Sequence, residues 1–156
     1  MKNKFFTKVF FTLYVAILLY ILFARYGNNF SMSVTDITNR LSTSVNLKPF
    51  YTIGSYLKAL ENGNVSSSVV KNNLLGNFLL FMPLPFFVYA FSKYKNVLWV
   101  ITLTALTVIA VEIIQIVTGL GSLDVDDFIL NVSGALIAYI LLKPKRKKEI
   151  NEKDHD

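Results

Sequence analysis

Four long apolar segments dominate this sequence and limit what it can fold into. They lie within residues 5–25, 73–92, 96–118 and 124–142. Each has close to the roughly 20 residues that a helix needs to cross a hydrocarbon core of about 30 Å. Apolar side chains make up 53% of the chain, more than the core of a soluble domain of 156 residues requires. The sequence therefore predicts an all-α membrane protein, a four-helix transmembrane bundle, with a single domain over residues 1–145.

The first apolar segment has a second interpretation, because an apolar stretch near an N-terminus can be a cleaved signal peptide. The run from Val9 to Ala24 is long, and no A-x-A-like cleavage site follows it. Its flanking basic residues, Lys8 and Arg25, have long side chains that can reach the membrane interfaces. We therefore predict a retained membrane helix.

Basic residues are distributed unequally between the two ends of these helices. With the N-terminus in the cytoplasm, eleven Lys and Arg residues fall on the cytoplasmic side and five fall outside. This bias follows the positive-inside rule and predicts a multi-pass protein with both termini cytoplasmic. The membrane that we expect is the bacterial plasma membrane. Residues 146–156 are predicted to be a disordered basic tail that contacts anionic lipid. Because topology accounts for the net charge of +6, nucleic acid is not predicted as a partner.

The external segment, residues 26–72, is rich in Ser, Thr and Asn and contains one amphipathic stretch. Its apolar residues recur at near-helical spacing, at Phe50, Ile53, Tyr56, Leu57 and Leu60. This pattern predicts a short interfacial helix on the outer leaflet, ended by a glycine. The alternative is a loop that packs on the ends of the membrane helices.

Polar side chains interrupt the second, third and fourth apolar segments at one depth, in the outer third of the membrane. On each helix they are three or four residues apart and so share a face. They are Asn73, Asn77, Glu112, Gln115, Asp124, Asp127 and Asn131, and Gly134 continues the face of the last helix. We therefore expect these side chains to converge on one pocket. Asp126 points elsewhere and is predicted to be solvated.

These polar residues allow a structural and a functional interpretation. Amides such as Asn77 can form interhelical hydrogen bonds, worth about 0.6 to 2 kcal/mol each, while Gly76 and Gly134 let helices approach closely. Glu112 is different, because an unpaired charge at that depth costs roughly 2.5 kcal/mol or more and is rarely kept without a use. It is predicted to donate or accept a proton, to bind a cation, or to contact a basic substrate.

Two prolines interrupt the second apolar segment below its polar residues. Pro83 and Pro85 cannot donate backbone hydrogen bonds to the carbonyls of Leu79 and Phe81. The sequence therefore predicts that this helix is kinked or broken there.

Four motifs together resemble the VanZ-like family, small membrane proteins named for a teicoplanin-resistance accessory. In chain order they are NLKPF (46–50), NNLLGNFLLFMP (72–83), EIIQ (112–115) and DVDDFILNVSGALIAYI (124–140). The resemblance spans most of the chain from residue 46 and preserves motif order and spacing. There are two departures: Pro85 stands where the family commonly has Gly, and the turn GLGS lacks a common Arg.

The resemblance implies lowered susceptibility to teicoplanin-type lipoglycopeptides. Its motifs match Asn73 with Asn77, Glu112 with Gln115, and Asp127 with Asn131 and Gly134. The ligand it implies is a membrane lipid, a lipid-linked cell-wall precursor or the lipoglycopeptide itself.

Three mechanisms remain open at this point. The pocket could bind or shield a headgroup through five predicted contacts, Asn73, Asn77, Gln115, Asp124 and Asn131. A membrane-embedded hydrolase or transferase could use Glu112 and Asp127 as catalytic acid and base, or to hold a divalent cation. Transport is the third possibility, but four helices are few for it. No Ser/His/Asp set, zinc spacing or phosphate loop favours a particular reaction.

Overall fold

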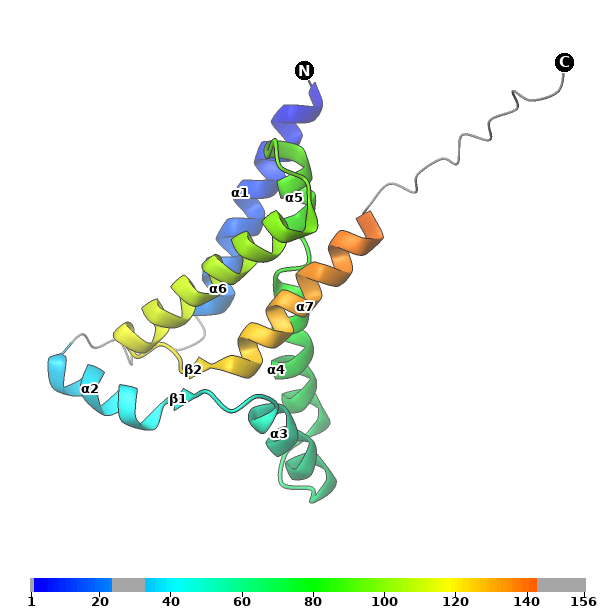
Figure 1. Cartoon of the computed structure of the whole chain (residues 1–156). Helices are drawn as coiled ribbons and strands as arrows, with labels where there is room; N and C mark the ends of the chain where they lie inside the picture. Colours follow the sequence, from blue (N-terminus) through cyan, green and yellow to red (C-terminus); the bar gives the residue numbers. More distant parts are fainter. Residues whose placement is uncertain (1, 24–32, 143–156) are drawn as a thin grey trace, which may run out of the picture.

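A computed structural model describes residues 2–23 and 33–142 of the chain, and nearly all of its regular structure is helical (Figure 1). In chain order the elements are α1 (Lys2–Phe23), α2 (Val34–Thr43), β1 (Val45–Asn46), α3 (Tyr51–Glu61), α4 (Ser67–Leu80), α5 (Leu84–Phe91), α6 (Val97–Thr118), β2 (Leu123–Asp124) and α7 (Val125–Leu142). The predicted C-terminal tail, residues 146–156, lies outside the described residues, as does Arg25.

Four helical segments in the described residues are long and apolar enough to cross a membrane. They are Lys4–Phe23, Ser67–Phe91, Val97–Thr118 and Val125–Leu142. Each span has large apolar side chains that are exposed in the isolated chain, as expected for helices whose outer faces contact lipid. The predicted all-α membrane bundle is thereby confirmed. The start of α1 and the end of α7 lie at one end of the bundle, and α2, α3 and the two strands lie toward the other (Figure 1).

The second span is broken at its prolines, as predicted. α4 ends at Leu80, three residues form a turn, and α5 begins at Leu84 with Pro85 in its first turn. The turn is held by backbone hydrogen bonds from Met82 to Leu79 and from Leu84 to Phe81. Pro85 is tolerated because the first turn of a helix has no intrahelical acceptor for its missing N–H.

α7 packs against both α4 and α6 at the centre of the bundle. It comes very close to α4 at Gly134, where an added Cβ would lie 1.8 Å from the carbonyl oxygen of Phe78. Gly134 therefore serves the close helix approach that the sequence predicts. The same prediction was wrong for Gly76, because a Cβ added there would meet no atom within 4 Å.

Residues 33–66, which precede the second span, contain more regular structure than the sequence predicts. The expected short helix is present as α3, which rules out an irregular loop there, and Gly63 follows it with a φ of 70°. Two further features have no counterpart in the prediction, the helix α2 and the parallel pairing of β1 with β2. In that pairing Val45 lies beside Leu123 and Asn46 beside Asp124, so the segment is joined to the start of α7.

Candidate functional site

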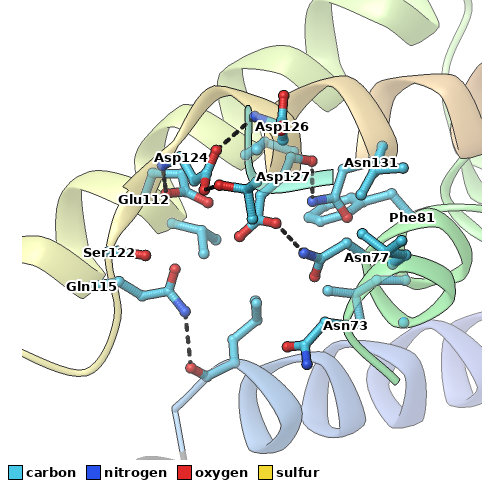
Figure 2. A pocket seen from close by; sticks show the side chains of 18 of the residues that line it. Asn73, Asn77, Phe81, Glu112, Gln115, Ser122, Asp124, Asp126, Asp127 and Asn131 are labelled. Atoms are coloured by element: carbon cyan, nitrogen blue, oxygen red, sulfur yellow. Dashed lines mark hydrogen bonds between the residues drawn. The ribbon is translucent and has the colours of Figure 1, made fainter. Parts of the chain in front are cut away.

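A polar cavity of about 190 Å³ lies where α4, α6 and α7 meet, with α1 and α3 contributing to its walls (Figure 2). All seven residues that the sequence predicts for the site line it: Asn73, Asn77, Glu112, Gln115, Asp124, Asp127 and Asn131. We call this cavity the polar pocket. The structure thus brings together the side chains that the sequence places at equal depth, from α4, α6 and α7, with Asp124 in β2 just before the helix that was predicted to contain it.

Glu112 reaches the polar pocket from α6 and is largely buried, with 8% of its surface exposed. Its Oε2 accepts a hydrogen bond from the backbone N–H of Asp124 at 3.1 Å. This contact forms because the chain turns back after α6 and places β2 beside the last turns of that helix. Within the described residues Oε1 has no hydrogen-bond partner, so one carboxylate oxygen is available to a ligand.

Asp127 and Asn77 connect α7 with α4 across the pocket. The Nδ2 of Asn77 donates a hydrogen bond to Oδ1 of Asp127. Asn131, one turn along α7, donates from Nδ2 to the backbone carbonyl of Asp127 at 2.7 Å. Its Oδ1 is buried and has no hydrogen-bond partner among the described residues. Rotating this amide would not help, since it would place the oxygen against the carbonyl of Asp127.

Gln115 and Asn73 occupy other walls of the polar pocket. Gln115 donates from Nε2 to the carbonyl of Leu22 at 3.1 Å and thereby ties α6 to α1. Asn73 donates to the carbonyl of Val69 within its own helix. The turn after Gln115 is tight, because Gly119 ends α6 with a φ of 75° and Arg40 of α2 packs over it. Arg40 also donates to the carbonyl of Val117 at 2.9 Å.

Asp124 is part of a hydrogen-bond network that holds the external segment on the pocket. Its Oδ1 accepts from Nδ2 of Asn46 at 3.2 Å, and its Oδ2 accepts from the hydroxyl of Thr52 at 2.5 Å. Sequence reasoning assigned no role to Asn46 or Thr52. The motif NLKPF could have pointed to Asn46, but only the fold reveals its partner.

The prediction that Asp126 is solvated was wrong. Its side chain is 1% exposed and accepts hydrogen bonds from the backbone N–H groups of Phe50, at 2.5 Å, and Ile53, at 3.0 Å. These groups lie at the start of α3, whose first N–H groups have no intrahelical acceptor. Asp126 thus caps α3 and docks it on α7, and Phe50 adopts a φ of 63° at this junction.

Carboxylates set the charge of the polar pocket. Four amides of its wall each use one of their two N–H donors on a protein oxygen: Asn73, Asn77, Gln115 and Asn131. Four carboxylates line the same cavity, and no basic residue does within ranges 2–23 and 33–142. The site therefore suits a ligand that donates hydrogen bonds or carries positive charge.

A metal ion was one of the predicted possibilities for the two catalytic candidates, Glu112 and Asp127. In the described part of the chain, no three His, Cys, Asp or Glu side chains are grouped so that they could hold one. Two of the four carboxylates are also used structurally, Asp124 toward Thr52 and Asp126 toward α3. The available carboxylates are therefore Glu112 and Asp127.

Comparison with protein families identifies the family of the chain. A search of the curated proteins gave no match, and neither did a search of the solved structures. The family model described as VanZ/LLP1 matches residues 11–146, which include most of the first membrane span, the whole of the other three and every side chain of the polar pocket. The chain belongs to the VanZ/LLP1 family.

Proposed function

We propose that this membrane protein lowers susceptibility to teicoplanin-type lipoglycopeptides by binding a lipid or cell-wall headgroup in the polar pocket. The observation that carries the proposal is the convergence of Glu112, Asp127 and Asn131 on one cavity with open acceptor atoms. Membership of the VanZ/LLP1 family supports the link to glycopeptides. Binding, or shielding of the headgroup from the antibiotic, requires no reaction.

The proposal also requires the polar pocket to open toward the cell exterior, where these antibiotics act. The excess of Lys and Arg near the start of α1, around residues 93–95 and after α7 supports a cytoplasmic location for that end of the bundle. The opposite end then carries the polar pocket, α2 and α3. We propose the bacterial plasma membrane as the location, with both termini cytoplasmic.

This topology can be tested with single cysteines at Ser44, Ser67 and Ser122. We expect all three to react with a membrane-impermeant maleimide in intact cells, because they lie at the end of the bundle that we place outside. The chain contains no native cysteine, so labelling is specific. A cysteine in the tail after Lys143 is the internal control. Labelling of that control together with protection of the other three positions would refute the orientation.

The function itself can be tested by expressing the protein in a teicoplanin-susceptible Gram-positive host. We expect the parent to raise the inhibitory concentration of teicoplanin and Asp127→Asn to lose most of that protection. The substitution removes a negative charge from the pocket while keeping an oxygen that can accept from Asn77. Asp36→Asn is the matched control, since Asp36 of α2 does not line the pocket. Equal protection by parent and Asp127→Asn, at equal expression, would contradict the proposal.

The second candidate function is a membrane-embedded hydrolase or transferase. The specific observation in its favour is that Glu112 and Asp127, from different helices, share one pocket with amides that could orient a substrate. The two candidates differ in one measurable respect. If the protein is an enzyme, Asp127→Asn should still bind the ligand but no longer protect the cells. Mass spectrometry of teicoplanin or of the lipid pool should then show a chemical change that the parent causes and the variant does not.

A further inference from the structure

An apolar groove of about 560 Å³ runs along α1, α5 and α6. Its walls include Phe11, Leu18, Phe87, Phe91, Trp99 and Leu103. On α1 the lining extends from Phe11 to Leu22, which is about 16 Å at a rise of 1.5 Å per residue. We call this cavity the apolar groove. Its length and its almost purely apolar lining suit a single alkyl chain.

The apolar groove adjoins the polar pocket. Leu22, Phe81 and Val111 line both cavities, so these three side chains form the boundary between them. From this shared wall the groove leads toward the end of α5 and the start of α6, which lie at the end of the bundle opposite to α3 (Figure 1). A molecule with a polar head and an apolar tail could therefore occupy both cavities at once.

The polar pocket also restricts the kind of headgroup. The hydrogen-bond partners of Glu112 and Asp127 leave one oxygen of each carboxylate open, and Asn131 adds a buried Oδ1 without a partner. A primary ammonium group has three N–H donors and one positive charge. It therefore matches three acceptors and compensates carboxylates that have no basic neighbour among the lining residues of the described ranges. A quaternary ammonium has the charge but no donor.

We propose that the polar pocket and the apolar groove hold the two ends of one membrane lipid, with its primary ammonium headgroup in the pocket and its acyl chain in the groove. The inference rests on the proposed function, because it specifies which headgroup the pocket binds. It adds that recognition of the lipid depends on its acyl chain as well as on its headgroup.

Photolabelling of the protein in phosphatidylcholine nanodiscs tests whether one lipid occupies both cavities. The probe is a phosphatidylethanolamine with a diazirine on its acyl chain, and the reference is a phosphatidylcholine with the same chain and a quaternary ammonium. We expect the ethanolamine probe to label groove residues of α1, α5 and α6 at least about tenfold more strongly, a ratio equivalent to roughly 1.4 kcal/mol. Unlabelled phosphatidylethanolamine should compete, and unlabelled phosphatidylcholine should not.

Two variants test whether head and tail belong to one molecule. Leu103→Trp fills the groove, and it should abolish the labelling; Leu106→Trp, on the lipid-facing side of α6, is the matched control. Asp127→Asn lies in the pocket, away from the diazirine, yet it should lower groove labelling by the ethanolamine probe to the level of the choline reference. Thermal unfolding in detergent verifies that each variant is folded, and either variant alone can decide the question.

Several results would overturn the inference. Groove labelling that is insensitive to headgroup, or to Asp127→Asn in a folded variant, would mean that the groove holds bulk lipid. Headgroup preference that survives Leu103→Trp would place the chain elsewhere. Equally strong labelling by a glucosyl diacylglycerol with the same chain would exclude a requirement for ammonium. If the labelling fails in one of these ways but teicoplanin protection still depends on Asp127, the proposed function stands without the lipid inference. If the parent gives no protection, the proposed function alone is removed.

Discussion

Gly134→Ala is expected to destabilise the bundle strongly. The new Cβ would lie 1.8 Å from the carbonyl oxygen of Phe78, and backbone atoms of a helix cannot move aside as the tip of a side chain can. α4 and α7 would have to separate, which also strains the hydrogen bond from Asn77 to Asp127 between the same helices. Overpacking of this kind costs about 1–3 kcal/mol or more. A lower unfolding temperature of the purified variant in detergent, and a lower expression level, would show it.

Gly76→Ala is the matched control, since it makes the same change in a helix of the same bundle. A Cβ at residue 76 meets nothing within 4 Å, and Ala favours a helix over Gly by up to about 1 kcal/mol. We therefore expect unchanged or slightly higher thermal stability. Equal stability of the Gly134 variant and its control would contradict the close approach of α4 and α7.

The contrast between these two glycines shows what spacing can and cannot predict. Residue spacing along α7 places Gly134 on the face of Asp127 and Asn131, so its contact with another helix was foreseeable. Spacing within one helix does not reveal how near the neighbouring backbone comes. Gly76 therefore looked equivalent in the sequence, although in the fold it borders the open space of the polar pocket.

The membrane spans and the convergence of the site were predictable for one physical reason. A helix that crosses a bilayer rises by a fixed distance per residue, and successive helices cross in opposite directions. The position of a residue in the sequence therefore sets its depth in the membrane. Glu112 near the end of α6 and Asp127 near the start of α7 then fall at one level. Pro83 was equally informative, because a missing N–H interrupts a helix whatever surrounds it.

The external segment could not be predicted to the same extent. The β1–β2 pairing joins two residues to two others nearly eighty positions away, too few for any periodic pattern. Asp126 appeared solvated because only the membrane helices entered the argument. Its actual partners are backbone N–H groups of Phe50 and Ile53, which no side-chain pattern reveals.

Glu112→Gln is expected to abolish protection against teicoplanin while leaving the fold intact. The side chain keeps its size, and its oxygen can still accept the hydrogen bond from the N–H of Asp124. What is lost is an ionisable carboxyl group, and with it the ability to hold a negative charge or a proton in the polar pocket. A hydrogen bond to a charged group is worth about 1.5–3 kcal/mol, so binding of a cationic headgroup should weaken by roughly tenfold or more. If the protein is an enzyme, loss of a general acid or base costs typically about 10² to 10⁴ in rate.

The measurement combines the inhibitory concentration of teicoplanin for expressing cells with the unfolding temperature of the purified variant. Glu61→Gln is the control, because Glu61 ends α3, is exposed and does not line the polar pocket. If Glu112 only accepts a structural hydrogen bond from Asp124, Gln should serve nearly as well, since hydrogen bonds between neutral groups in membranes are worth only about 0.6 to 2 kcal/mol. A stable variant with full protection would therefore assign Glu112 to holding β2 on α6, whereas a stable variant without protection places its ionisable carboxyl in the function of the pocket.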